Sequence, residues 1–187
     1  WQANPELVLD FYNKRRKNAL EVRPNRGHEL LAELERDHEV VVITQNVDNL
    51  HERAGSSYVI HLHGELFKSR STYDESLIYN VEGWQLNLGD RCEKGSQLRP
   101  HIVWFGELVP MMEPAINELK HADVFVIVGT SLLVYPAASL IDYVADEIPK
   151  FLIDPNIPKI ASYSNMTCIP KTGSTGLAEF IRIIGTI

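Results

Sequence analysis

Apolar positions near the start of the chain recur at helical spacing. Asn4 and Pro5 suit the N-cap and the first turn of a helix, and apolar side chains follow one turn apart to about residue 17. Beyond the break at Pro24, three leucines with the same spacing predict a second amphipathic helix that ends near Asp37. We therefore expect two helices before the first strand.

Uninterrupted apolar runs, each followed by polar or glycine-containing turns, indicate buried strands. These runs cover residues 40–43, 58–62, 123–128 and 151–153. A run without polar alternation is typical of a strand covered on both faces of a parallel sheet. Helices are expected at 50–53, 136–146 and 177–184, and the alternation of strands with helices predicts an α/β fold with right-handed crossovers.

This periodicity fails between residues 68 and 99. Polar residues and glycines there surround single apolar side chains, which are Leu77, Ile78, Tyr79, Trp84 and Leu86. We interpret the segment as a small inserted module whose own core is made by these five residues.

Composition excludes several classes of protein. The 187 residues include 18 Lys plus Arg against 25 Asp plus Glu, a net charge of -7, which disfavours binding to nucleic acid. No apolar run reaches the ~18 residues of a membrane span. Cys92 and Cys168 are far apart and unpaired in pattern, so we expect reduced thiols and a cytoplasmic protein. The chain begins with Trp1 and without signal-peptide features, as expected for the remainder of a longer chain.

Polar clusters follow three of the predicted strands, at 44–48, 129–131 and 154–156. In open α/β sheets, ligands bind beyond the carboxyl ends of the strands, so the clusters outline one candidate crevice. The turn at 129–131, Gly-Thr-Ser, would let a ligand approach the backbone, although such a turn also occurs for structural reasons alone. Asp48 is equally suited to cap the short helix that follows it.

Three of the seven histidines, His61, His63 and His101, lie away from the predicted helices, and the first two are candidates for a general base. His61 and His63 share strand parity and lie just before Gly64, where the absence of a side chain would let another group approach an imidazole. Histidine suits proton transfer near neutral pH, and parity does not choose between the two. The sequence contains no nucleophile elbow, Walker loop or His-Glu-x-x-His motif.

Taken in order, these motifs resemble the signatures of the sirtuins, which are NAD-dependent protein-lysine deacylases. The matching segments are 44–51, 54–55, 62–64, 99–107 and 129–137. The resemblance implies a Rossmann-like parallel sheet with helices on both faces plus the small module. It also implies a reaction that breaks the nicotinamide–ribose bond of NAD and moves an acyl group from lysine to ADP-ribose. The partners would be acylated lysine side chains of proteins; the sequence indicates no oligomeric state.

The resemblance also suggests roles for particular residues. His63 would be the general base that activates a ribose hydroxyl, with Asn46 as the second catalytic residue. Residues that would meet the cofactor are Gln45, Asn46, Asp48, Gly129, Thr130, Ser131 and Asp154. Residues that would meet the acyl-lysine peptide, bound as an added strand between 103–107 and 133–135, are Tyr12, Arg15, Val103, Trp104, Phe105, Gly106, Glu107, Val134 and Tyr135. Trp104 and Phe105 would wall the lysine tunnel, the alternative being ordinary core aromatics.

Three features depart from the family pattern. The N-terminal strand and Gly-rich loop that cradle the pyrophosphate have no counterpart, so we expect an N-terminally truncated catalytic domain that binds NAD weakly. Asp154 stands where an Asn usually meets the adenosine ribose. The four zinc thiolates of the family correspond to Ser71, Asp74, Cys92 and Ser96, and because hydroxyls are poor zinc ligands we expect no metal.

The acyl group is suggested by the first helix. Tyr12 and Arg15 are spaced i, i+3 on a face that also carries Val8 and Phe11, which we expect to point toward the protein. Arg15 is either a solvated charge beside Arg16 and Lys17 or a cation inside the acyl pocket. Tyr-x-x-Arg resembles the sirtuins that accept succinyl-, malonyl- or glutaryl-lysine, which favours the second interpretation.

The expected organisation is one catalytic domain over 1–187. Its large part covers about 38–67 and 100–187, and its small module covers about 68–99 together with the helices of 1–37. The expected activity is removal of succinyl or malonyl groups, with acetyl as a further substrate. The alternative is a non-catalytic module that binds ADP-ribose or acyl peptide, which the absent Gly-rich loop favours.

Overall fold

The computed structural model describes residues 1–130, 134–157 and 163–185. The chain divides into two compact units. Unit 1 comprises Trp1–Arg23, Asn46–Leu50 and His63–Leu108, and unit 2 comprises Pro24–Gln45, His51–Leu62 and Val109–Ile187. These boundaries differ from the expected ones in two ways. Residues 24–37 pack with the parallel sheet of unit 2, and residues 46–50, 63–67 and 100–108 belong to unit 1.

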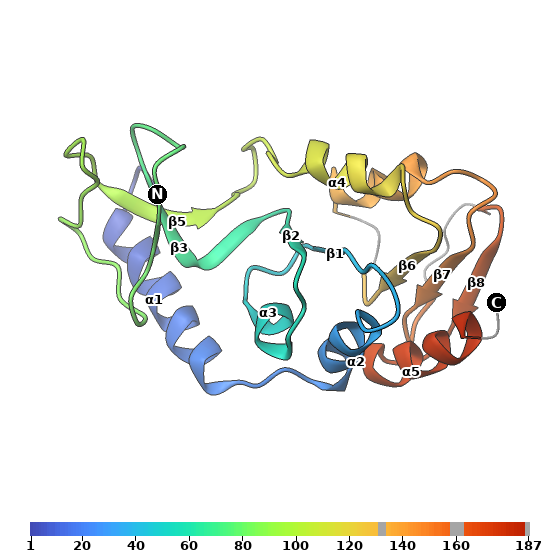
Figure 1. The fold of residues 1–187 in the computed structure, drawn as a ribbon. Coiled ribbons are helices and arrows are strands. Elements are labelled where there is room, and N and C mark those ends of the chain that lie inside the picture. Colours follow the sequence, from blue (N-terminus) through green and yellow to red (C-terminus); the bar gives the residue numbers. More distant parts are fainter. Residues whose placement is uncertain (131–133, 158–162, 186–187) are drawn as a thin grey trace. The chain divides into compact units, whose positions relative to one another are not determined.

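Unit 1 is built on an antiparallel sheet with the order β4-β3-β5, of which Figure 1 labels β3 and β5. The strands are β3 (Gly64–Ser71), β4 (Ile78–Asn80) and β5 (Leu98–Ile102), and helix α1 (Pro5–Glu21) packs on β3 and β5. Asn4 caps α1 as expected, since its Oδ1 accepts from the Leu7 N–H at 3.0 Å. The helix continues four residues beyond Lys17. The sequence pattern did not indicate β3 and β5, because these strands bury polar side chains, among them Ser69, Arg70 and Arg99.

Two polar residues of α1 hold the inserted module. Asn13 exchanges two hydrogen bonds with the backbone of Leu86, at 3.1 and 2.9 Å. Arg16 is fully buried and donates to the carbonyls of Trp84 at 2.8 Å and Leu66 at 3.1 Å. Burial lowers the pKa of Arg16 to about 10, so the guanidinium stays charged at neutral pH. Arg16 is therefore a buried structural residue, a role that the sequence analysis did not predict.

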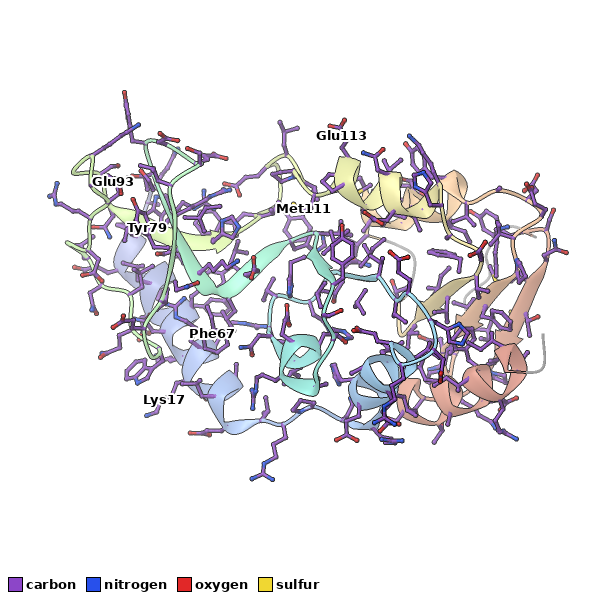
Figure 2. All side chains as sticks on the ribbon, viewed as in Figure 1. Lys17, Phe67, Tyr79, Glu93, Met111 and Glu113 are labelled. Atoms are coloured by element: carbon purple, nitrogen blue, oxygen red, sulfur yellow. The ribbon has the colours of Figure 1, made fainter. Side chains whose placement is uncertain are left out.

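The apolar side chains of the module are less buried than expected. Leu86 is buried at 4% exposure, but Ile78 is 44% exposed and is not part of the module's core. Polar contacts also hold the module together. Tyr79 donates to Glu93, and both side chains are labelled in Figure 2. This bond raises the pKa of Tyr79 to about 12. Lys17, also labelled, places its ammonium 5.5 Å from the Trp84 ring centroid.

Unit 2 contains parallel strands in two groups. Strand β1 (Val42–Thr44) pairs with β2 (Val59–His61), and β6 (Phe125–Val128), β7 (Lys150–Ile153) and β8 (Met166–Ile169) form a parallel sheet with β7 in the centre. Its helices are α2 (Arg26–Leu34), α3 (Leu50–Ala54, which begins in unit 1), α4 (Met112–Leu119), the 3-10 helix η1 (Ala137–Tyr143) and α5 (Gly173–Ile184).

Side chains of β7 alternate between two apolar layers, which explains why its sequence is apolar throughout. Phe151 and Ile153 pack with residues of α2 and α5, whereas Leu152 packs with Ile141 of η1. Helices therefore cover both faces of this sheet, and the expected α/β fold is confirmed (Figure 1). The sequence pattern missed α4 and β8, and the helix expected at 136–146 is a shorter 3-10 helix. Within the described ranges, every helix is too short or too polar to cross a membrane.

Candidate active site

Gly129 and Asp154 follow adjacent parallel strands of unit 2 and lie at the same edge of the sheet. The Gly129 N–H donates to the Ile153 carbonyl at 2.9 Å, and the Asp154 N–H donates to Ile169 at 3.3 Å. Gly129 has a φ of +60°, and a Cβ added there would meet no atom within 4 Å, so a ligand can approach its backbone. Thr130, half-buried, follows directly, whereas Ser131 and Leu133 lie outside the described residues.

The carboxylate of Asp154 also shapes its own turn. Its Oδ1 accepts from the Asn156 N–H at 2.7 Å. This turn is the Asx type that Asp favours after a strand. The geometry therefore allows both a structural role and a hydrogen bond to a ribose hydroxyl.

The structure separates the two candidate histidines. His61 ends β2 in unit 2, is 7% exposed, and its Nε2 lies 2.6 Å from Oε1 of Glu52 on α3. Gln45 follows β1 at the same end, because Thr44 pairs with His61. His61 thus has a carboxylate partner in the fold, and Glu52 is a residue that the sequence reasoning missed.

His63 lies in unit 1, in the turn between β2 and β3. It is half-buried, and its carbonyl accepts from the Val103 N–H at 2.9 Å, which ties it to the loop at 103–107. Gly64 next to it has a φ of +84°, and a Cβ there would lie 2.1 Å from the His101 carbonyl oxygen. A glycine is required at position 64 because the backbone of β5 lies so close to it. The sequence had suggested a different reason, the approach of another group to an imidazole.

Asn46 and Asp48 belong to a segment of unit 1 that is hydrogen-bonded to β3. The Leu66 N–H donates to the Val47 carbonyl at 2.6 Å. Oδ1 of Asp48 accepts from the Leu50 N–H at 3.1 Å, so the capping alternative is correct for this oxygen. The side chain of Asn46 is exposed.

Glu107 closes the loop at 103–107 from within. Its carboxylate accepts from both terminal nitrogens of Arg99, at 2.6 and 3.1 Å, from Arg70 at 3.2 Å, and from the Trp104 N–H at 2.9 Å. Partial burial alone would raise the pKa of Glu107, but the bonds from Arg99 and Trp104 outweigh it and keep the pKa below its ordinary value. Glu107 thus contacts its own loop, and Arg99, which the sequence reasoning did not single out, completes the ion pair.

Trp104 lies at the centre of an aromatic and cationic stack. The Arg99 guanidinium lies 3.5 Å from its ring centroid, and its Nε1 donates to the Tyr12 hydroxyl at 2.8 Å. The Trp1 ring lies 6.0 Å away. Phe105, by contrast, is fully exposed, so it is not a core aromatic.

The face of α1 that carries Arg15 points to solvent more than expected. Phe11 is 51% exposed, which corrects the expectation that it points toward the protein. Arg15 is exposed and its guanidinium lies 5.7 Å from the Phe11 ring centroid. The same ring meets Tyr12 edge-on at 5.1 Å, so Phe11 contacts both residues of the Tyr-x-x-Arg motif.

Val134 and Tyr135 belong to unit 2, and both are exposed, at 41% and 74%. Gly106 is exposed in unit 1. Exposed apolar side chains beside backbone groups suit recognition of an extended peptide.

The four side chains at the family's zinc position do not fit a zinc ion. Cys92 donates from Sγ to Ser71 Oγ at 3.4 Å, and Ser71 Oγ also accepts from the N–H groups of Tyr73 and Asp74. Ser96 Oγ pairs with Thr72 at 2.6 Å. A bond from Lys94 contributes most to lowering the pKa of Asp74 to about 2. Across the residues described, His, Cys, Asp and Glu nowhere gather in threes that could hold a metal.

Comparison with known proteins gives consistent matches over most of the chain. A family model described as the Sir2 family matches residues 1–136. An NAD-dependent protein deacylase of Bacteroides thetaiotaomicron is 51% identical over 189 residues, covering 98% of this chain and 81% of that protein. One from Helicobacter pylori is 52% identical over 181 residues, covering 97% and 79%.

Solved structures agree with these matches. The crystal structure of a Sir2 homolog–NAD complex superimposes with a TM-score of 0.87 at 36% identity, over 99% of this chain and 74% of that one. Sir2Tm bound to a propionylated peptide superimposes with a TM-score of 0.81 at 29% identity, over 100% of this chain and 81% of that one.

Proposed function

The chain belongs to the Sir2 family, and from this premise we propose that it removes acyl groups from protein lysines in an NAD-dependent reaction. The relatives at about half identity carry the name NAD-dependent protein deacylase, and a solved structural neighbour holds NAD. The observation in this chain that supports the proposal most is that the two histidines have different surroundings. His61 is buried against Glu52, whereas His63 is half-buried beside the loop at 103–107.

NAD would supply the reactive ribose carbon, with nicotinamide as the leaving group. Gly129, Thr130 and Asp154 offer a backbone, a hydroxyl and a carboxylate oxygen to riboses and phosphates, and Gln45 offers an amide. Asn46 and the second oxygen of Asp48 suit the nicotinamide carboxamide. The other oxygen of Asp48 stays with Leu50, which orients the side chain.

His63 would take the proton of a ribose hydroxyl. His61 is bound by Glu52 and buried, so it serves the fold, whereas the half-buried His63 sits on the backbone of the loop expected to bind peptide. Histidine is the side chain best suited to proton transfer near neutral pH.

The matched pair of histidine substitutions tests this role. His63→Ala should lower kcat by about 10² to 10⁴ while the protein keeps its melting temperature. His61→Ala should lower the melting temperature, because it leaves Glu52 without its partner, and should reduce kcat much less. An equal loss of kcat in both variants, or a loss only in His61→Ala, contradicts the proposal.

We further propose that the preferred acyl group is succinyl or malonyl. Arg15 presents an exposed guanidinium one helical turn from the Tyr12 hydroxyl, on the same helix face. A carboxylate that meets this pair gains charge-assisted hydrogen bonds of about 1.5 to 3 kcal/mol, whereas an acetyl group offers no charge.

The acyl preference is measured on one peptide carrying succinyl- or acetyl-lysine. Wild type should favour the succinyl form in kcat/KM, and Arg15→Met should reverse the preference. Arg15→Lys should restore only part of it, because an ammonium does not match the two oxygens of a carboxylate. If Arg15→Met keeps the wild-type preference, Arg15 does not contact the acyl group.

A further inference from the structure

Trp104 donates its indole N–H to the hydroxyl of Tyr12, and the direction of this bond has a chemical consequence. An indole nitrogen has a hydrogen but no accepting lone pair, so at 2.8 Å the Tyr12 oxygen is the acceptor. The phenol's own single hydrogen must then point away from Trp104. The hydrogen of a hydroxyl held in this way can be donated to a ligand that accepts a hydrogen bond.

A hydrogen bond donated by Tyr12 suits an acyl group that ends in an acceptor, and it is strongest when that acceptor is an anion. An ionised carboxylate accepts hydrogen bonds and donates none, and the methyl group of an acetyl does neither. The edge-on ring of Phe11 lies 5.1 Å from the Tyr12 ring and 5.7 Å from the Arg15 guanidinium. The Tyr12 ring and the Arg15 guanidinium thus both contact one exposed ring, and the Tyr12 hydroxyl and the guanidinium are both donors that favour an anion.

The position of Trp104 itself is set by an ionised carboxylate. Glu107 accepts from the Trp104 backbone N–H at 2.9 Å and grips both terminal nitrogens of Arg99. Arg99 in turn lies flat on the indole at 3.5 Å and donates to the Ile102 carbonyl at 3.0 Å. Arg99 is 8% exposed, so this contact is desolvated and strong.

Charge is balanced within this cluster. Arg99 and Arg70 both pair with Glu107, and Arg70 also lies 3.5 Å from Glu75. Their charges are therefore committed to the loop, whereas Arg15 is exposed on α1. The cluster orients its neighbours and leaves the recognition of an anion to Arg15 and Tyr12.

We propose that Trp104 and Glu107 are positioning residues for acyl selection: Glu107 fixes Arg99 and Trp104, and the Trp104 indole fixes the Tyr12 hydroxyl as a donor to an anionic acyl group. This inference rests on the acyl preference proposed above. It goes beyond that proposal because it places part of the specificity in two residues that need not touch the anion.

A double-mutant cycle tests the inference on the full-length protein. The ratio of kcat/KM for succinyl over acetyl peptide is measured in wild type, Trp104→Phe, Tyr12→Phe and the double variant. Tyr12→Phe should lower the ratio about tenfold, as expected for loss of one hydrogen bond to a charged group. Trp104→Phe should lower it about threefold, mostly through KM, and should cause no further fall when Tyr12 is already Phe.

Two variants serve as matched comparisons. Trp1→Phe changes the other indole of the stack, which has no bond to Tyr12, and should leave the ratio unchanged. Glu107→Gln keeps the shape of the side chain but removes its charge, so it provides a second route should Trp104→Phe fold poorly. It too should lower the ratio in the presence of Tyr12 and not in its absence.

The outcomes separate the inference from the proposal on which it rests. If wild type shows no succinyl preference, the acyl proposal fails and the inference falls with it. If wild type shows the preference, two results overturn the inference alone: an unchanged ratio in both Trp104→Phe and Glu107→Gln, or a fall of equal size with and without the Tyr12 hydroxyl.

Discussion

At the scale of single residues, neighbours in the sequence have opposite roles. Arg15 and Arg16 follow one another on α1, but Arg15 is exposed and Arg16 is completely buried. The buried arginine satisfies two backbone carbonyls that no apolar residue could serve. We infer that Arg16 is a structural anchor and that Arg15 is available for recognition.

Thermal and urea unfolding can measure this difference. Arg16→Met should lower the free energy of unfolding by about 3 kcal/mol, because it leaves the carbonyls of Trp84 and Leu66 buried without a donor. Arg15→Met, the matched control, should change it by less than about 0.5 kcal/mol. A similar loss in both variants would show that Arg16 is not the anchor.

The pH dependence of stability reports on Glu107. Its folded pKa lies below the ordinary value of 4.5, so its ionised form stabilises the fold above that pH. The contribution is lost as the pH falls below 4.5 through the lower folded pKa. We expect wild type to melt at a higher temperature than Glu107→Gln at pH 7, with the gap closing toward pH 3; a gap that is constant with pH would contradict the ion pair.

At the scale of elements, one glycine permits the close approach of two strands. Gly64 begins β3 with a φ of +84°, and a Cβ there would overlap the His101 carbonyl of β5. Gly83 has a comparable φ of +72° but open space around it. The pair distinguishes backbone strain from steric overlap.

Substitution by alanine separates the two effects. Gly83→Ala should cost about 1 kcal/mol of unfolding free energy from the positive φ alone. Gly64→Ala should cost more than about 2 kcal/mol, since the backbone of β5 must also move. Equal losses at the two positions would mean that β5 accommodates the added methyl group.

Apolar patterning predicted the parallel strands β1, β2, β6 and β7 of unit 2 but missed β8, and it did not predict the antiparallel sheet of unit 1. The interior of strand β7 is apolar because both faces of the strand are covered, and such a run is recognised as a strand from the sequence alone. Strand β3 buries Ser69, Arg70 and Ser71, whose partners come from distant segments, so polarity there suggests a loop. The 3-10 helix η1 has a helical pattern, and periodicity does not distinguish it from an α-helix.

Site residues that belong to family motifs could be predicted from the sequence. The hydrogen bonds and ion pairs between them could not. Motif resemblance pointed to His63 and Arg15. It could not show that Glu52 binds His61, that Glu107 closes its own loop, or that Phe11 is exposed, because each depends on tertiary contacts. The opposite charges of Arg99 and Glu107, on either side of a largely apolar stretch, were the one signal in the sequence of the ion pair that closes this loop.

At the scale of the whole molecule, stability without a metal is an expectation that can be measured directly. Two hydroxyls, a carboxylate and one thiol stand at the position of the family's zinc ligands: Cys92 donates to Ser71, Ser96 pairs with Thr72, and Lys94 donates to Asp74. Elemental analysis of the purified protein should find less than stoichiometric zinc, and a chelator should not lower its melting temperature. One zinc per chain that survives dialysis against chelator would refute this.

The central claim concerns the whole reaction, and a product balance tests it most directly. The full-length protein is incubated with NAD and a succinyl-lysine peptide, and free lysine peptide, nicotinamide and O-succinyl-ADP-ribose are counted by mass spectrometry. We expect the three products in equal amounts, and none of them when either NAD or the acyl group is omitted. Deacylation that proceeds without NAD, or binding of ADP-ribose and acyl peptide with no turnover, would contradict the assignment as an NAD-dependent deacylase.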